Sequence, residues 1–410
     1  MTKTPRHAAM PQFPVIDDCL QVGGRPLTDI AKEVGSTPFY VYERRLMTER
    51  MQMLRRMLPQ KLIIQYAIKA NPMPVVVQHM AGLVDGLDVA SAGELRVALD
   101  SGMAPENISF AGPGKMDWEL HRAVAARAVI NLESEGEMER AAKIGERIGV
   151  QPRVAARVNP AFELKASGVK MGGGAKPFGV DSERVPAMLG RLGELGLDFR
   201  GFHIYSGSQN LSAQSIIDAQ NKTIALGLDL ARFAPSKVGV LNIGGGFGIP
   251  LFPGDEPLDL APIAENLAAR MSELEQQLEG TRVAIELGRY LVGEAGLYVC
   301  EVIDRKISRG EVFLVTNGGL HQHLAASGNF GQVLRKNFPV VVGNKFQGAE
   351  REIANVVGPL CTPLDILASR MELAQAQPGD LIVVYQSGAY GYTTSPIAFL
   401  GHPAPAQLLV

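Results

Sequence analysis

The sequence predicts an α/β protein, with a (β/α)8 TIM barrel followed by a C-terminal, mostly antiparallel β domain. Between Pro38 and Arg289, short apolar runs alternate with amphipathic helical stretches about eight times. After Arg289 the apolar runs follow one another with Gly and Pro loops and little helix between them. Polar and charged residues also gather where the expected barrel strands end, which is where such barrels place their active sites.

Three regions follow from this pattern. Residues 1–35 hold short apolar pieces broken by Pro and Gly, without a helical period, and we expect them to pack on the β domain. Residues 36–289 form the barrel, and residues 290–410 form the C-terminal β domain. An open doubly wound sheet is the weaker alternative for the central region, because such sheets usually stop at about five to seven strands.

The elements are expected in a regular order. The barrel strands are expected at Ile63–Ala70, Gly86–Ser91, Ile108–Gly112, Ala128–Glu133, Arg153–Pro160, Phe199–Gln209, Val238–Gly246 and Arg282–Arg289. The helices are expected at Gly93–Ser101, Trp118–Ala126, Glu135–Ile148, Val185–Leu195, Ser212–Phe233 and Leu258–Leu278. The strands of the C-terminal domain are expected at Tyr298–Ile307, Val312–Thr316, Phe338–Val342 and Asp380–Tyr385.

Composition excludes several classes of function. The formal charge is −2, from 40 basic and 42 acidic residues, so no electrostatic attraction to nucleic acid or to an anionic membrane is expected. No apolar run approaches the roughly 20 residues of a spanning helix, and the start lacks a secretory signal. The three cysteines, Cys19, Cys300 and Cys361, fit neither a disulfide framework nor a zinc pattern. We therefore expect a cytoplasmic enzyme without a metal.

Lys69 ends the first barrel strand, in the run IIQYAIKANP. A lysine at the mouth of a buried strand is costly, because its ammonium group loses water there. Desolvation lowers the pKa of such an amine, and it can then form a Schiff base with a carbonyl cofactor. The alternative is a lysine that extends its ammonium group to solvent, and for an isolated lysine this alternative would be preferred.

The other strand ends favour the functional interpretation. They carry Asp88, Arg157, His203 with Ser206, the glycines 244–246, and Glu286 with Arg289. Each has a structural alternative, such as a helix cap for Asp88, a core histidine for His203 or a turn for the glycines. The convergence of all of them on one rim by chance is much less probable.

These residue types suit pyridoxal phosphate. Backbone N–H groups of the glycines 244–246 can approach a phosphate closely, and Ser206 and Arg289 add donors. A carboxylate such as Glu286 keeps the pyridine nitrogen protonated, which makes the ring a strong electron sink. His203 has the flat ring needed to stack on the cofactor.

The motifs YAIKAN, DGLDVASAGEL, FHIYSGSQ, NIGGGFG, ELGR, GPLCTPLD and SGAYGY resemble those of the alanine-racemase-like, fold-type III pyridoxal phosphate decarboxylases. That family includes diaminopimelate, ornithine and arginine decarboxylases. The segments KMGGGAKPFGVD and GGLHQHLAASGNFGQ are most similar to the decarboxylases associated with exosortase systems. The resemblance implies a barrel, a C-terminal β domain and a homodimer with shared active sites.

The resemblance also implies roles for individual residues. It implies that Lys69 holds the cofactor, that His203 stacks on its ring, that Glu286 meets the pyridine nitrogen, and that Asp88 lies near Lys69. The phosphate would be held by Ser206, Gly245, Gly246, Arg289 and Tyr390, and Arg157 at the same rim is counted among the cofactor-binding residues. Cys361 would reach in from the second subunit.

Cys361 has two interpretations. A lone cysteine is more often a small buried hydrophobic residue than a catalyst. Here it lies in the Gly/Pro loop GPLCTPLD, which is a poor place for core packing. A thiol in this loop can protonate the carbanion after carbon dioxide leaves, and together with the resemblance this makes catalysis the favoured interpretation.

The expected reaction is decarboxylation of an α-amino acid, through a Schiff base and reprotonation of the carbanion. Diaminopimelate decarboxylases have Glu directly after the active-site Cys and an Arg-Pro-x-Leu-Tyr run after the barrel, whereas this chain has Thr362 and no such run. We expect Thr362 and Asp365 to contact the substrate. The alternatives are an aminoacyl group carried by an acyl carrier protein, a racemase on the same fold, and a non-catalytic pyridoxal phosphate carrier.

Overall fold

The computed structural model describes residues 6–162, 169–170, 172–332, 334–347 and 350–410; Met171, within the KMGGGAKPFGVD motif, lies outside them. The contacts divide the chain into two compact units. One unit contains residues 49–249 and 258–291 and is called the barrel unit below. The other contains residues 1–48, 250–257 and 292–410 and is called the β unit.

The barrel unit confirms the predicted fold. Its strands are β5 (Ile63–Ala67), β6 (Gly86–Val89), β7 (Ile108–Phe110), β8 (Val129–Leu132), β9 (Arg153–Asn159), β12 (Asp198–His203), β14 (Val240–Gly245) and β15 (Arg282–Leu287). All neighbours are parallel, and the pairings of β8 with β9 and of β15 with β5 close the sheet into a barrel. The short strand β11 (Val180–Asp181) adds to the outer edge of β9.

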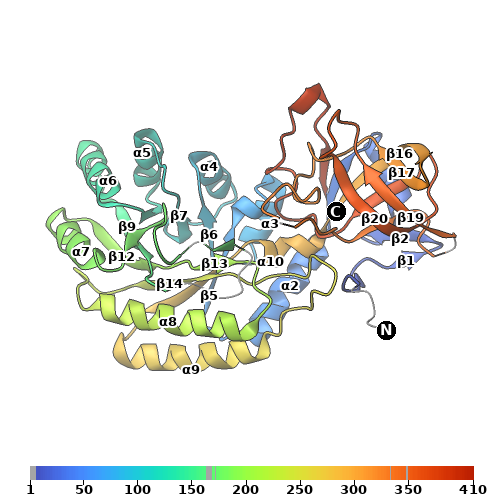
Figure 1. Ribbon diagram of the computed structural model, residues 1–410. Helices are drawn as coiled ribbons and strands as arrows, with labels where there is room; N and C mark the ends of the chain where they lie inside the picture. Colours follow the sequence, from blue (N-terminus) through green and yellow to red (C-terminus); the bar gives the residue numbers. More distant parts are fainter. Residues whose placement is uncertain (1–5, 163–168, 171, 333, 348–349) are drawn as a thin grey trace. The chain divides into compact units, whose positions relative to one another are not determined.

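Helices surround the barrel strands in Figure 1. They are α3 (Pro74–Ala81), α4 (Ala92–Asp100), α5 (Asp117–Ala126), α6 (Glu135–Ile148), α7 (Val185–Glu194), α8 (Ala213–Ala231) and α9 (Ala261–Gln277), with α2 (Arg44–Met57) and α10 (Arg289–Val292) at the unit boundaries. Local sequence sets several of their ends. Ser91 and Ser134 each accept a hydrogen bond from the backbone N–H three residues later, and Gly149 ends α6 in the left-handed conformation.

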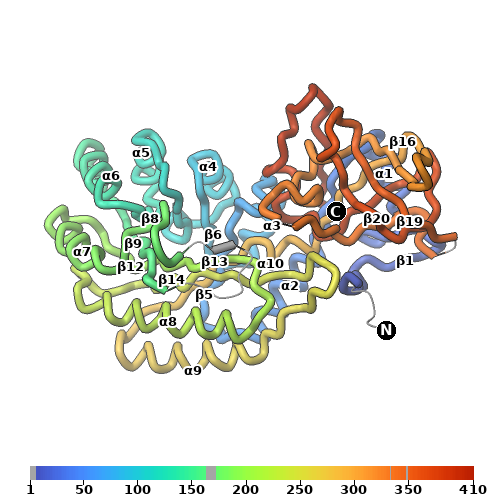
Figure 2. The backbone as a smooth tube through the Cα atoms, viewed as in Figure 1, coloured from blue at the N-terminus to red at the C-terminus, as the bar shows by residue number. Residues whose placement is uncertain are grey.

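The β unit is mostly antiparallel, also as predicted. Its strands are β1 (Val15–Ile16), β2 (Cys19–Val22), β3 (Arg25–Pro26), β4 (Phe39–Tyr42), β16 (Gly296–Ser308), β17 (Glu311–Thr316), β18 (Val340–Val342), β19 (Arg351–Val357), β20 (Ile366–Ala374), β21 (Leu381–Val384) and β22 (Ala406–Leu409). Strand β4 lies between β16 and β22, so an early strand of the chain pairs with its last strand. Figure 2 traces the backbone of this unit, with its early residues in blue and its last residues in red. The pairs β17–β19 and β22–β4 are parallel.

Two features of the β unit were not expected from the sequence. Helix α1 (Leu27–Val34) lies in the segment that shows no helical period; it begins after Pro26 and ends at Gly35 in the left-handed conformation. Strands β19 and β20 were missed because long parts of them are half-exposed and carry charged residues. Tertiary pairing with β17 therefore decides their conformation more than local apolar content does.

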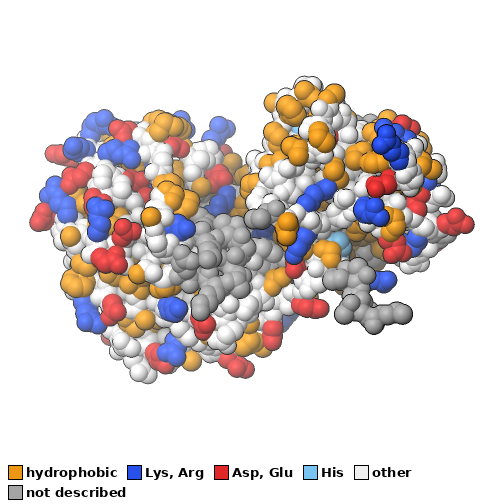
Figure 3. Space-filling model, in the orientation of Figure 1, with side chains coloured by type: hydrophobic (Ala, Val, Ile, Leu, Met, Phe, Trp, Pro, Cys, Tyr) orange, Lys and Arg blue, Asp and Glu red, His pale blue; other side chains and the backbone are white. Residues whose placement is uncertain are grey.

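The surface agrees with the balanced composition. On the face shown in Figure 3, acidic and basic side chains are interspersed over the barrel unit. Among the described residues, no helix has both the length and the apolar character needed to cross a membrane.

Candidate active site

Strand register brings the predicted residues of the barrel unit to one level. Arg157, His203 and Asn242 are paired positions on the neighbouring strands β9, β12 and β14. Because paired residues of parallel strands point to the same side of the sheet, their side chains project together. The carboxyl ends of these strands form one rim of the barrel, which is the expected place for an active site.

Lys69 lies directly after β5 and forms an ion pair with Asp88 of β6. Its Nζ is 3.3 Å from Asp88 Oδ2, and Ser109 Oγ donates to the other carboxylate oxygen at 3.2 Å. The lysine side chain is 39% exposed, whereas the Asp88 side chain is 1% exposed. Burial, and secondarily the charge of Glu286, raise the pKa of Asp88. The amine is thus oriented by a buried acid while solvent can still reach it.

Glu286 is a fully enclosed carboxylate on β15. Asn242 Nδ2 donates to its Oε1 at 2.7 Å, and His203 Nε2 lies 3.0 Å from the same oxygen. Burial by itself would raise the pKa of Glu286. The charges of His203, Lys69 and Arg157 outweigh burial and lower the pKa to about 2, so Glu286 is an anion at neutral pH.

Gly244 and Gly245 are the last residues of β14, and Gly246 follows the strand directly. Gly244 and Gly246 have φ of +72° and +88°, which residues with a side chain rarely adopt. A Cβ at Gly245 would collide with the carbonyl oxygen of Glu286, and one at Gly246 would press on the carbonyl oxygen of Gly207. The backbone therefore packs closely here, and only residues without a side chain fit. Ser206 is buried beside Gly207, and Arg289 begins α10.

Arg157 is held by a residue that the sequence interpretation did not single out. Its Nη1 donates to Glu133 Oε1 at 2.5 Å, and both side chains are buried. Asn242, which binds both Glu286 and Gln65, was missed as well. Both had a signal in the sequence, since Glu133 ends the fourth predicted strand and Asn242 precedes the glycine triplet by two positions.

The remaining predicted residues belong to the β unit. Cys361 is exposed in the loop before β20, and Thr362 beside it is half-buried. Asp365 is buried, and its two carboxylate oxygens accept the backbone N–H groups of Leu320 at 2.6 Å and Leu360 at 2.9 Å. These bonds join the loop that carries Cys361 to the loop after β17. They favour a positioning role for Asp365, and its direct contact with a substrate stays a prediction.

Tyr390 lies in the glycine-rich turn after β21. Its φ of +55° is unusual for a residue with a side chain, and its carbonyl oxygen accepts Thr394 Oγ1 at 2.7 Å. This bond braces the turn, as the structural alternative expects. A phosphate contact of the Tyr390 hydroxyl stays a prediction.

The rim of the barrel unit fits pyridoxal phosphate by its chemistry. A half-exposed amine, a buried anion and a glycine segment that excludes side chains come together within one barrel end. The ring nitrogen of the cofactor needs an anionic partner, its aldehyde needs an amine, and its phosphate needs accessible N–H donors. Asn242 fixes the carboxylate of Glu286 and also accepts the N–H of Gly244 at 2.9 Å, which links the carboxylate to the glycine segment.

Comparisons with known proteins agree with this chemistry. The family described as "Pyridoxal-dependent decarboxylase, pyridoxal binding domain" matches residues 44–293. The L-glutamyl–BtrI acyl-carrier protein decarboxylase of Niallia circulans is 37% identical over 91% of this chain and 88% of its own. The diaminopimelate decarboxylase of Aquifex aeolicus is 30% identical over 96% of this chain and 91% of its own.

Solved structures are similar over nearly the whole chain. AQ1208 from Aquifex aeolicus superposes with a TM-score of 0.85 at 29% identity, covering 98% of this chain and 92% of its own. A variant of the diaminopimelate decarboxylase of Helicobacter pylori, complexed with L-lysine, superposes with a TM-score of 0.83 at 25% identity, covering 93% and 94%.

Proposed function

Because the chain belongs to the pyridoxal-dependent decarboxylases, we propose that it removes the α-carboxylate of an aminoacyl group whose far end is uncharged, as in a thioester to an acyl carrier protein. The membership confirms the predicted pyridoxal phosphate cofactor and the predicted decarboxylase activity. It also favours a decarboxylase over the racemase and the non-catalytic carrier that were considered as alternatives. The identity of the substrate is the part that we propose.

The observation that carries the proposal is the scarcity of charge around Cys361. Residues 317–334 contain no Asp, Glu, Lys or Arg, and residues 358–365 contain one, Asp365. Arg335, the next charged residue, donates to the carbonyl oxygen of Ile366 at 2.7 Å. The carboxylate of Asp365 is already bound by two backbone N–H groups. A substrate with a second ammonium or carboxylate group would need an opposite charge to bind its far end, because an unpaired charge is costly to desolvate. An ester or thioester would not.

In the proposed reaction, the residues of the rim hold the cofactor in a fixed orientation. Lys69 provides the amine that attaches it, and Glu286 keeps a proton on the ring nitrogen. His203 covers one ring face, while the N–H groups of Gly245 and Gly246 and Ser206 face the phosphate, as suits a backbone that admits no side chains. When bound, pyridoxal phosphate supplies the electron sink for the carbanion left by carbon dioxide. Cys361 then donates a proton to the substrate carbon.

The experiment compares three substrates with the cofactor-loaded protein. Release of carbon dioxide is measured from free L-glutamate, from free diaminopimelate and from a glutamyl thioester of pantetheine. We expect kcat/KM for the thioester to exceed kcat/KM for free L-glutamate and for free diaminopimelate by roughly a hundredfold. This factor corresponds to the free-energy cost of burying about one unpaired charge. Faster release from diaminopimelate would overturn the proposal in favour of a free diamino acid as the substrate.

We also propose a homodimer with shared active sites. In the β unit, the loops near Cys361 expose the apolar side chains of Phe330, Leu334 and Leu364, the last of which is 60% exposed. Asn329 Nδ2 donates to the carbonyl oxygen of Leu364, which joins two of these loops. Such a patch is typical of a surface that a partner covers. Mixing Lys69→Ala and Cys361→Ala proteins should restore part of the activity; no recovery would contradict shared sites. A cytoplasmic location stays a prediction.

A further inference from the structure

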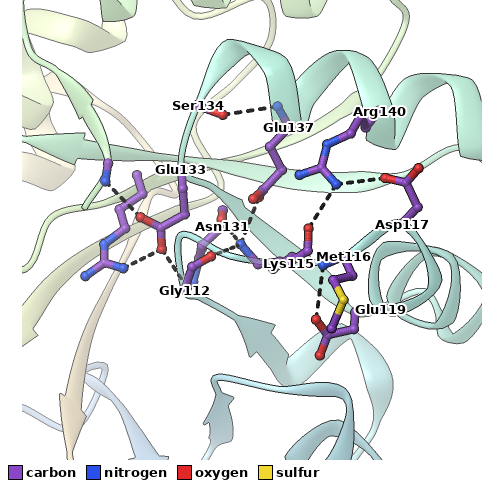
Figure 4. Close-up of polar contacts among 12 residues, drawn as sticks. Gly112, Lys115, Met116, Asp117, Glu119, Asn131, Glu133, Ser134, Glu137 and Arg140 are labelled. Atoms are coloured by element: carbon purple, nitrogen blue, oxygen red, sulfur yellow. Dashed lines mark hydrogen bonds and ion pairs between the residues drawn. The ribbon is translucent and has the colours of Figure 1, made fainter. Parts of the chain in front are cut away.

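Glu133, at the end of β8, is a carboxylate with three hydrogen-bond donors. Its Oε1 accepts the backbone N–H of Gly112 at 2.6 Å and Arg157 Nη1 at 2.5 Å. Its Oε2 accepts the backbone N–H of Gly179 at 2.8 Å. Figure 4 shows these bonds converging on Glu133. One buried side chain thus ties together the ends of β7 and β9 and the segment that leads into β11.

Arg157 connects Glu133 to the cofactor rim. It is paired with His203 across β9 and β12, and its guanidinium carbon lies 5.2 Å from the centre of the Phe178 ring. Its charge is among those that lower the pKa of Glu286. Arg157 is buried, so its orientation depends on its partners and not on solvent.

The segment between β9 and β11 is fixed at the same place. A Cβ at Gly179 would press on the carbonyl oxygen of Arg157, so the bond from Gly179 to Glu133 holds two backbones in close contact. Earlier in this segment, β10 (Val169–Lys170) pairs with β13 (Gly207–Ser208), directly after Ser206. Among the described residues, this part of the chain therefore pairs with Gly207 and Ser208 at one end and donates to the carboxylate of Glu133 at the other.

A second buried carboxylate offers a matched comparison. Glu137, at the start of α6, accepts Lys115 Nζ at 2.8 Å, and both side chains are 1% exposed. Lys115 also donates to the carbonyl oxygens of Gly112 at 2.8 Å and Asn131 at 2.9 Å (Figure 4). These bonds stay within β7, β8 and α6. Glu137 is as buried as Glu133 and also accepts the backbone N–H of Glu133, but its side-chain partner is Lys115, whereas that of Glu133 is Arg157 of β9.

We propose that Glu133 is a positioning residue for the decarboxylation: it orients the guanidinium group of Arg157 toward the cofactor rim. The proposal rests on the proposed place of the cofactor at this rim. A carboxylate suits the task because it accepts hydrogen bonds only, and three donors converge on it. A glutamine of the same shape has one acceptor oxygen, and its amide group would face at least one of those donors.

The test titrates pyridoxal phosphate into cofactor-free full-length protein and follows the absorbance of the bound cofactor. We expect Glu133→Gln to weaken cofactor binding about tenfold, as for the loss of one charge-assisted hydrogen bond. We expect Glu133→Asp, which keeps the charge, to recover part of this loss. The control is Glu137→Gln. We expect Glu137→Gln and Glu133→Gln to lower the melting temperature by similar amounts, and only Glu133→Gln to weaken the affinity for the cofactor.

A double variant separates a positioning role from a structural one. If Glu133 acts through Arg157, then adding Glu133→Gln to Arg157→Ala should weaken cofactor binding by less than about twofold more. Additive losses, or an unchanged affinity in Glu133→Gln, would overturn the proposal. This readout needs no substrate, so an inactive enzyme that still shows the coupling would contradict the proposed substrate and leave the role of Glu133 standing.

Discussion

Among the described residues of the barrel unit, two lysine–carboxylate pairs near strand ends differ in exposure. Lys69 pairs with Asp88 after β5, and Lys115 pairs with Glu137 after β7. The side chain of Lys69 is 39% exposed, whereas that of Lys115 is 1% exposed and has all three donors bound. An amine that must react needs to be reachable from solvent. An amine that supports a scaffold does not.

The acids of the two pairs show the same difference. Burial raises the pKa of both Asp88 and Glu137. After burial, the largest influence on the pKa of Asp88 is the charge of Glu286, which raises it further, and Lys69 opposes the rise. For Glu137 the largest influence after burial is Lys115, which opposes the rise, and Glu133 raises the pKa by a smaller amount. Two buried acids near one half-exposed amine form an arrangement that folding alone does not favour. Buried ionisable groups whose pKa values are shifted by neighbouring charges are typical of a functional site.

The pair Lys69–Asp88 is called the open pair below, and the pair Lys115–Glu137 the closed pair. The largest expected effect comes from removing Lys69 from the open pair. Lys69→Ala should abolish the visible absorbance of the bound cofactor and lower the decarboxylation rate by at least roughly a thousandfold, because it removes the attaching amine. The measurement is an absorption spectrum after dialysis, together with release of carbon dioxide. Retention of both signals would show that another amine holds the cofactor.

Breaking the closed pair should affect stability instead. Lys115→Met leaves Glu137 buried without its cation, which costs about 3–5 kcal/mol in comparable cases. Urea unfolding measures this loss, and cofactor absorbance should persist in the fraction that is folded. The control is the double variant Lys115→Met/Glu137→Leu, in which most of the stability should return because no charge is left unpaired. A double variant as unstable as the single one would refute this account.

The sequence was sufficient to predict the barrel and most of the rim. Strand ends in a barrel converge by topology, so Lys69, His203 and Glu286 needed no coordinates to be placed on one rim. The distinction between Lys69 and Lys115 was harder, because exposure depends on what covers each side chain. The motif YAIKAN was what indicated that Lys69 is the reactive lysine.

Supporting residues were much less predictable. Glu133 and Asn242 act through hydrogen bonds between strands that are distant in sequence, for example Asn242 with Gln65 and Glu286. Their residue types are ordinary at strand ends, so only the register reveals what they bind. Likewise, Asp365 was expected to meet a substrate, and its bond to Leu320 depends on a loop that lies 45 residues earlier in the chain.

A third prediction concerns Glu286, the buried anion near Lys69 and Asp88. Glu286→Gln should keep cofactor binding but lower kcat by roughly a hundredfold, because the ring nitrogen loses the anion that keeps it protonated. The measurement is kcat with saturating substrate, and KM should change less than kcat. The matched control is Glu137→Gln, which removes a buried carboxylate outside the rim and should leave kcat unchanged. An equal fall of kcat in both variants would point to a general loss of structure.

The smallest expected effect is a change of stability with pH in the cofactor-free protein. The pKa of Asp88 is raised from 3.8 in the folded state, so its ionisation opposes folding at neutral pH, and this penalty disappears as the pH falls below 3.8. Asp88→Asn should therefore stabilise the protein at pH 7 by on the order of 1 kcal/mol, with no gain at acidic pH.

Glu286→Gln should act in the opposite direction. The folded-state pKa of Glu286 is lowered from 4.5 to about 2, so its stabilisation is fully present above 4.5 and declines as the pH falls toward 2. Melting temperatures of both variants between pH 3 and pH 7 would test this opposition. If both variants shifted in the same direction, the two carboxylates would share one environment, and the contrast between the open and closed pairs would have to rest on exposure alone.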